Sequence, residues 1–171
     1  NATVDIPAIV KHMVGRSIDT YYPPRNADIG TIVFSADTLS SRTGIADISF
    51  DVRAGEIVGM AGLIGAGRTE TARTIFGIDE KTGGRMTLLG GEYNPSSPAA
   101  AIAAGVAFLT EDRKRTGLCL NLPCSWNVTF PNLAKLGMRW LINHRREREA
   151  VHELTSQVSI KWSSPEAPGD S

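Results

Sequence analysis

The stretch Gly62-Leu63-Ile64-Gly65-Ala66-Gly67-Arg68-Thr69 sets the fold expected of the chain around it. It matches the pattern GxxxxGK[ST] at every position but one, because Arg68 stands where the pattern has lysine. The three glycines let the backbone curl tightly and turn its N–H groups inward, where they can bind an anion. A helix that starts directly after such a loop adds a favourable dipole. The stretch therefore predicts a phosphate-binding loop.

The segments on either side of this loop supply the expected context. Before it, residues 56–61 are almost wholly apolar, which predicts a strand buried on both faces. After it, residues 69–76 place their apolar side chains on one face at helical spacing, and Gly77 can close that helix. The sequence thus predicts a strand, a glycine loop and a helix in succession.

Other segments predict a mixed α/β chain. The β-branched and aromatic residues of 31–34 and the alternation of apolar and polar residues over 48–52 predict strands with one face in water, as in an antiparallel sheet. Residues 85–89 predict a further strand, and 106–109 predict a buried one. The segment from 163 onward is expected to be a loop. Helical periodicity predicts the remaining elements over residues 4–15, 97–104, 126–133 and 145–158, the last with Val151, Leu154 and Val158 on one face.

Composition limits the kinds of partner. The chain has 171 residues, of which 42% are hydrophobic and 21% charged, as in a globular protein with a real core. Its 18 Lys and Arg residues balance 18 Asp and Glu residues, so no basic excess points to nucleic acid. The apolar stretches are too short to cross a bilayer, and any membrane contact is expected to be peripheral. Cys119 and Cys124 form no CxxC unit, which favours free thiols.

Two alternatives to a nucleoside triphosphate site stay open for the glycine loop. A strand-to-helix turn can be glycine-rich for packing alone, with Thr69 as an ordinary helix cap. The dinucleotide fingerprint GxGxxG is matched in its first half by Gly65 and Gly67, but Glu70 replaces its third glycine. The triphosphate interpretation is favoured because a hydroxyl at Thr69 can bind a Mg²⁺ ion that bridges the phosphates.

A second cluster of polar residues lies at positions 110–118. Five consecutive charged residues, 111–115, follow the predicted strand at 106–109. The carboxyl end of a strand is where α/β folds bind ligands. A run of charges is more often a solvated loop, and this alternative also stays open.

Three stretches together resemble a known family. They are residues 48–59, 62–70 and 110–118, supported by 13–16. They resemble the second nucleotide-binding domain of the fused ATPase subunits of bacterial carbohydrate ABC importers, the ribose, galactose and xylose type. The resemblance implies an α/β phosphate-loop NTPase fold of the ABC type with an antiparallel β subdomain on the amino-terminal side. It implies that 29–171 is the amino-terminal part of such a domain, ending before the signature motif, with 1–28 as a helix and linker.

The resemblance also implies roles for residues. The arginine form of the loop is similar to the degenerate site of the second domain, and no catalytic residue is expected. Glu111 falls where many ABC ATPases have the glutamine of the Q-loop, and Thr69 is implied as the Mg²⁺ ligand. No aromatic residue stands at 39–44, where these ATPases often stack adenine. The residues implied in nucleotide binding are Gly62, Ile64, Gly65, Ala66, Gly67, Arg68, Thr69 and Glu70.

The implied function is that of the ATP-binding, energy-coupling component of a sugar importer. The implied partners are membrane permease subunits, another nucleotide-binding domain and, indirectly, a periplasmic sugar-binding protein. The implied location is the cytoplasmic face of the inner membrane, as a peripheral subunit. ATPase activity is expected of the parent protein and not of this chain alone, because hydrolysis also needs a signature motif and a water-positioning carboxylate. A non-enzymatic nucleotide-binding or interaction module, a small kinase and a dinucleotide-binding domain remain as rivals.

Overall fold

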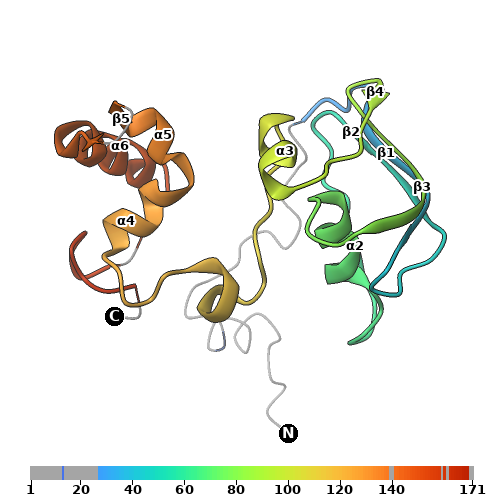
Figure 1. The fold of residues 1–171 in the computed structure, drawn as a ribbon, viewed down its shortest axis with the longest axis horizontal. Helices are drawn as coiled ribbons and strands as arrows, with labels where there is room; N and C mark the ends of the chain where they lie inside the picture. The colour runs from blue at the N-terminus through green and yellow to red at the C-terminus, as the bar shows by residue number, and fades with distance from the viewer. Residues whose placement is uncertain (1–12, 14–26, 139–140, 159, 161, 170–171) are drawn as a thin grey trace, which may run out of the picture. The chain divides into compact units, whose positions relative to one another are not determined.

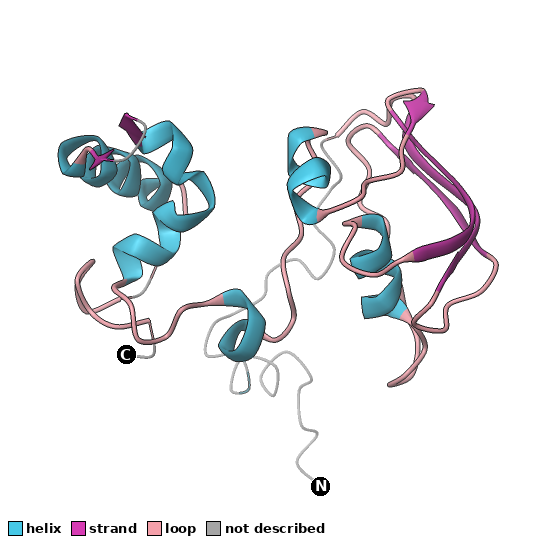
Figure 2. Cartoon of the chain, viewed as in Figure 1, coloured by secondary structure: helices cyan, strands magenta, loops and turns pink. Residues whose placement is uncertain are grey.

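The computed structural model describes residues 13, 27–138, 141–158, 160 and 162–169. The chain divides into two compact units, Asn1–Ala107 and Phe108–Ser171, and each is described by itself (Figure 1). The helix predicted over 4–15 and the linker after it lie outside the described residues. The secondary structure of both units is drawn in Figure 2.

The first unit is built on an antiparallel sheet in the order β2-β1-β3-β4. Its strands are β1 (Ile32–Ser41), β2 (Ile48–Arg53), β3 (Lys81–Leu88) and β4 (Gly91–Glu92). Phe34 pairs with Val52 on one side and with Leu88 on the other, which fixes the register of the three long strands. The strands predicted at 31–34, 48–52 and 85–89 and their antiparallel arrangement are confirmed.

A bulge in β1 keeps its apolar residues on one face of the sheet. Phe34 and Ala36 are buried, then Asp37 and Thr38 are exposed, and Leu39 is buried again. The register with both neighbouring strands shifts here. Gly84 lies opposite with φ +79, and a Cβ there would come within 2.4 Å of the Thr38 carbonyl oxygen. The bulge therefore depends on a glycine in β3.

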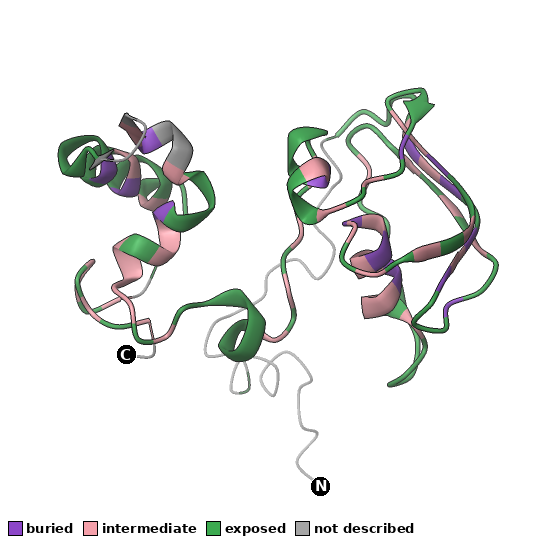
Figure 3. Ribbon diagram, viewed as in Figure 1, coloured by how far each residue is buried: buried purple, intermediate pink, exposed green. Residues whose placement is uncertain are grey.

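Two helices complete the first unit. Helix α2 (Arg68–Ile75) lies against one face of the sheet, and α3 (Pro98–Ala103) begins at Ser97, whose hydroxyl accepts from Ala100 N. The buried residues gather where α2 faces the strands (Figure 3). Both predicted helices are confirmed, as is the closing role of Gly77, which has φ +72. The core side chains are Phe34, Ala36, Leu39, Ile45, Phe76, Met86, Tyr93 and Ala101.

The two predictions of a buried strand, at 56–61 and at 106–109, are wrong. Residues 56–61 have no regular secondary structure, and the side chain of Ile57 is 94% exposed. Residues 106–109 are also irregular, and Leu109 is 94% exposed. An apolar run becomes a buried strand only where neighbouring strands accept and donate its backbone hydrogen bonds. The described residues place no strand beside either run.

The second unit is mostly helical. It contains a π-helical turn (Arg113–Gly117), α4 (Cys124–Thr129), a 3-10 turn (Phe130–Asn132), α5 (Leu133–Leu136) and α6 (His144–Ser156). A short hairpin, β5 (Gly137–Met138) with β6 (Leu141–Ile142), precedes α6. Helix α6 confirms the prediction for 145–158. Its predicted apolar face is only partly right, because Val151 is buried whereas Leu154 and Val158 are exposed.

The helix predicted over 126–133 is broken in the structure. Helix α4 ends at Thr129, and Pro131 lies in the 3-10 turn that follows. Proline has no N–H and its ring clashes with the carbonyl of the preceding turn, so an α-helix cannot continue through it. The loop predicted from 163 onward is confirmed and packs on α4, where the carbonyls of Ala167 and Pro165 accept from Cys124 N and Ser125 N.

Candidate phosphate-binding site

The glycine loop leads directly into the first turn of α2. Gly65 has φ +84 and Gly67 has φ +80, both in the left-handed region that favours glycine. Between them, Ala66 N donates to the Leu63 carbonyl oxygen at 3.0 Å and closes a turn. Gly67 is the cap of α2 and has no side chain to accept from the first-turn N–H groups. Because those groups also lack an acceptor within the helix, this end of α2 suits an anion.

Two of the glycines are also required by close contacts. A Cβ on Gly67 would lie 2.8 Å from Ile45 Cγ2, in the buried side chain beneath the loop. A Cβ on Gly62 would lie 2.8 Å from Ala66 Cβ, across the turn of the loop itself. Gly65 has nothing within 4 Å of such an atom. The loop is therefore shaped by its own contacts and by Ile45.

Buried threonines hold the first two turns of α2. Thr71 N and Thr71 Oγ1 both donate to the Gly67 carbonyl oxygen, at 2.8 and 2.7 Å. Thr74 Oγ1 donates to the Glu70 carbonyl oxygen at 2.7 Å. Both threonines are 1% exposed. The loop carbonyl that ends the glycine run is thus fixed from inside the protein, whatever is bound outside.

An ion pair secures the other end of α2. Arg73 Nε and Nη2 donate to the two carboxylate oxygens of Asp79, at 2.9 and 2.8 Å. The hydrogen bonds between these two side chains lower the pKa of Asp79 and raise the pKa of Arg73. The Asp79 side chain is 6% exposed and that of Arg73 39%. A bidentate pair of this kind fixes the direction in which the chain leaves the helix.

The predicted ligand residues surround an open surface. Gly62, Ile64, Gly65, Ala66 and Arg68 are exposed, and Gly67, Thr69 and Glu70 are half-buried. The Arg68 guanidinium carries the one positive charge within the loop motif. The described residues contain no group of three His, Cys, Asp or Glu side chains placed to hold a metal ion. A divalent cation here would need Thr69 together with phosphate oxygens and water.

The charged stretch of the second unit forms a defined turn that sequence patterns did not predict. Glu111 is exposed and precedes Asp112, whose carboxylate accepts from Arg115 N at 3.1 Å. Thr116 Oγ1 donates to the Asp112 carbonyl oxygen at 2.8 Å and contacts Thr110 Oγ1 at 2.7 Å. A π-helical turn is rare and is often found at functional sites. Glu111 belongs to a different unit from the glycine loop, and the two are described separately.

Comparison with known proteins identifies the family of the chain. Residues 45–162 match the model of the ABC transporter family. The chain belongs to the ABC transporter family. It is 44% identical, over 95% of its length, to the ribose import ATP-binding protein RbsA of Lactococcus lactis subsp. lactis, and 41% identical over the same share to that of Bacillus subtilis. It is also 44% identical, over 90% of its length, to a putative ribose/galactose/methyl galactoside import ATP-binding protein of Rhizobium etli.

The chain spans about a third of the length of these relatives, 33%, 33% and 29% respectively. Family membership confirms the predicted α/β phosphate-loop fold of the ABC type, and the antiparallel sheet lies on its amino-terminal side. The described helices include none that is long and apolar enough to cross a membrane.

Some residues that shape the site were not predicted from the sequence. Ile45 supports Gly67 from below, and Thr71 binds the Gly67 carbonyl. The contact of Thr71 could have been predicted from its spacing, because a threonine side chain can donate a hydrogen bond to the carbonyl four residues before it. No sequence pattern could have predicted the contact of Ile45, since only the fold brings this residue beneath the loop.

Proposed function

We propose that this chain forms part of the ATP-binding, energy-coupling component of an ABC-type sugar importer. The observation that supports it most directly is the entry into α2, where Gly65 and Gly67 both adopt left-handed backbone and no side chain caps the helix. The printed names of its relatives, which are import ATP-binding proteins, support the transport role.

In this proposal the nucleotide phosphates bind at the glycine loop. The backbone N–H groups of Gly65, of Gly67 and of the first turn of α2 face the phosphate oxygens, and Arg68 adds a positive charge. Thr69 binds Mg²⁺, which is held otherwise by the nucleotide and by water. Glu70 places a carboxylate in the same turn, so binding favours a nucleotide that carries its metal.

The site is proposed to be the second, degenerate one of its parent protein. Lysine presents a compact charge that can reach between terminal phosphates, whereas guanidinium is a broad planar fork. Arg68 therefore supports binding better than it supports hydrolysis. The parent is proposed to be an ATPase coupled to carbohydrate import, and this chain alone to turn over no ATP.

The partners in this proposal are membrane permease subunits, another nucleotide-binding domain and, indirectly, a periplasmic sugar-binding protein. The loop at Glu111 is proposed to face the permease, and the support for this is the family resemblance. The chain would act at the cytoplasmic face of the inner membrane as a peripheral subunit. The rival interpretation, a module that binds nucleotide without an enzymatic role, shares the same loop.

Thermal unfolding with added nucleotide tests the proposal. A ligand at a hundred times its Kd adds about 2.7 kcal/mol of stability. We expect millimolar Mg-ATP and Mg-ADP to raise the melting temperature, NAD to leave it unchanged, and Thr69→Ala to abolish the shift. Arg68→Lys should bind Mg-ATP at least as tightly. A shift with NAD alone, or a full shift in Thr69→Ala, would contradict the assignment of this loop.

A further inference from the structure

Strand β2 lies at one edge of the antiparallel sheet in the first unit. Among the described strands, it has β1 on one side and no strand on the other (Figure 1). Its side chains alternate between half-buried and exposed along the whole strand, so β2 has an apolar face and a polar face. Unpaired N–H and C=O groups along such an edge can pair with a further strand. The edge of β2 is therefore a candidate surface for a partner that brings a strand.

The backbone of β2 presents Ser49 and Asp51 to this edge. Just after the strand, Ala54 N donates to the Thr31 carbonyl oxygen at 2.9 Å, so the backbone of Ala54 faces the β1 side. Along a strand, successive residues direct their N–H and C=O groups to alternate sides. The backbone groups of Arg53, Asp51 and Ser49 therefore face away from β1.

Glu56 closes one end of this edge. Glu56 Oε2 accepts from Arg53 N at 2.8 Å, and Glu56 N donates to the Arg53 carbonyl oxygen at 3.0 Å. Both outward backbone groups of Arg53 are therefore taken within the chain. Within the described residues, no group outside the ladder with β1 forms a hydrogen bond with the backbone of Ser49 or Asp51. The open part of the edge is thus short and well defined.

We propose that two copies of this chain pair through β2 in antiparallel register, with Phe50 opposite the partner's Phe50. In this register Ser49 of each copy lies opposite Asp51 of the other, and these residues exchange N–H and C=O groups. The apolar faces also continue into each other, because Ile48 lies opposite the partner's Val52. Aromatic and β-branched residues in such cross-strand positions stabilise a sheet. A second copy supplies both the hydrogen bonds and the apolar neighbours that this edge lacks.

The charges around β2 select this register. Asp47, Asp51 and Arg53 are exposed, and none of them has an ion-pair partner within the described residues. Pairing centred on Phe50 brings Asp47 of each copy opposite Arg53 of the other. Moving the centre one residue forward sets Asp51 against the partner's Asp51, and one residue back sets Asp47 against Asp51. Like charges directly opposite each other are destabilising, whereas opposite charges stabilise the pair.

A second copy fits this edge better than an unrelated strand does. The strand is complementary to itself in hydrogen bonding, in its apolar residues and in charge, whereas an unrelated segment would match all three only by chance. Because the open edge is short, the association is expected to be weak and to depend on concentration. It is also independent of the nucleotide site, since no residue of the glycine loop takes part.

Sedimentation equilibrium of the whole chain without nucleotide tests the proposal. Over about a hundredfold range of concentration we expect a reversible equilibrium between monomer and dimer. Arg53→Glu creates two pairs of like charges and should weaken dimerisation by at least about tenfold. Asp47→Lys should weaken it similarly. The double variant, with both changes, reverses each pair and should dimerise within about threefold of the unmodified chain.

A second pair of variants tests the hydrogen bonds. Asp51→Pro removes the N–H that faces the partner and leaves the ladder with β1, since proline is tolerated where the N–H of an edge strand faces outward. It should abolish the dimer. The matched control, Asp51→Asn, keeps the N–H and should change dimerisation less than about twofold. Circular dichroism checks that each variant keeps the strand content of the chain.

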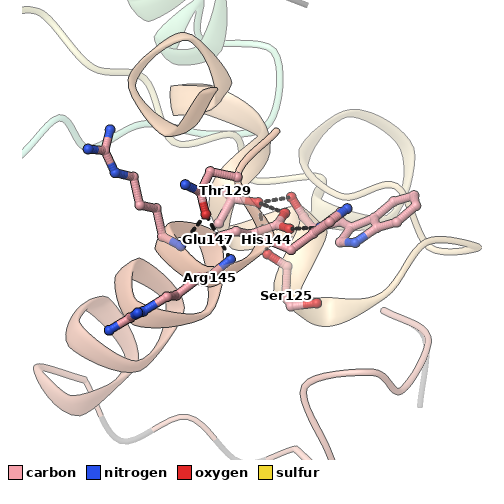
Figure 4. Close-up of polar contacts among 8 residues, drawn as sticks. Ser125, Thr129, His144, Arg145 and Glu147 are labelled. Atoms are coloured by element: carbon pink, nitrogen blue, oxygen red, sulfur yellow. Dashed lines mark hydrogen bonds and ion pairs between the residues drawn. The ribbon is translucent and has the colours of Figure 1, made fainter. Parts of the chain in front are cut away.

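The second unit provides an internal control. Its helices α4 and α6 are joined by Thr129 Oγ1, which donates to Glu147 Oε1 at 3.1 Å (Figure 4). None of the residues of the proposed interface lies in this unit, and all three tryptophans do. The tryptophan emission should therefore be the same in every variant as in the unmodified chain.

Three results would overturn the proposal. The first is a chain that stays monomeric at the highest concentration. The second is a dimer that Asp51→Pro leaves intact, which would place the contact on another surface. The third is a double variant, Asp47→Lys with Arg53→Glu, that dimerises no more tightly than the single variants, because the two charges would then not be opposite each other.

Discussion

Replacing Gly67 by alanine should destabilise the first unit more than the same change at Gly65. Both residues have positive φ, so an alanine at either position costs about 1–2 kcal/mol of backbone strain. Only at Gly67 does the new Cβ meet another atom, Ile45 Cγ2 at 2.8 Å. Overpacking a buried contact costs about 1–3 kcal/mol more. The expected losses are therefore about 2–5 kcal/mol for Gly67→Ala and about 1–2 kcal/mol for Gly65→Ala.

The assay must report on the first unit alone. All three tryptophans, at positions 126, 140 and 162, lie after Phe108, so their fluorescence follows the second unit. Urea unfolding is therefore followed by the amide NMR signals of Thr71 and Met86. A double variant, Gly67→Ala with Ile45→Ala, should lose less than the sum of the single losses because the truncated side chain no longer meets the new Cβ. Equal losses for Gly65→Ala and Gly67→Ala, or strict additivity in the double variant, would refute the role of Ile45.

Two further substitutions each test one stabilising contact, the first in the first unit and the second in the second unit. Asp79→Asn removes the charged partner of Arg73 and should lower the unfolding free energy by about 1–2 kcal/mol at pH 7, discounted for the exposure of Arg73. Because the pKa of Asp79 is lowered in the folded state, its contribution to stability is full above its unfolded pKa of about 3.9 and is lost as the pH falls through the folded pKa. In urea unfolding from pH 6 down to pH 2, the unfolding free energies of the variant and of the unmodified chain should therefore converge. A difference that stays constant over this range would contradict this. Asn127→Ala removes the amide that accepts from Cys119 N at 2.8 Å and donates to carbonyls within 119–123. It should lower the unfolding free energy of the second unit by about 2–4 kcal/mol, measured by tryptophan fluorescence in urea, and a loss below about 0.5 kcal/mol would contradict its role.

Local patterns predicted the first unit well because its elements are stabilised by their neighbours in sequence. Strands β1 and β2 are joined by a short turn, and their alternation matches the two faces of the sheet. The α2 helix followed from the glycine loop and the apolar spacing after it. The bulge at Thr38 was not predicted, since it depends on Gly84 in a strand more than forty residues later.

The predictions failed where an element needs a partner that pattern alone cannot supply. Residues 56–61 have the composition of a buried strand, yet Ile57 is almost fully exposed because no described strand lies beside it. The prediction of a helix over 126–133 failed for a local reason, because the proline at 131 interrupts it. The apolar spacing of the segment was given more weight than this proline. In the candidate site, the motif predicted the glycines and Thr69, and their role in binding stays a prediction, whereas the contact of Ile45 with Gly67 could be found only from the fold.

The contacts that shape the glycine loop explain why its lysine position can change without loss of the loop. Gly67 is fixed by Ile45 below it and by Thr71 behind it, and Arg68 takes part in neither contact. Arg68 is exposed, so its side chain adds little to the packing of α2. The geometry that presents N–H groups to an anion is therefore independent of the residue that would assist hydrolysis. We therefore expect nucleotide binding at this loop to survive a loss of efficient turnover, because the contacts that shape the loop do not involve Arg68.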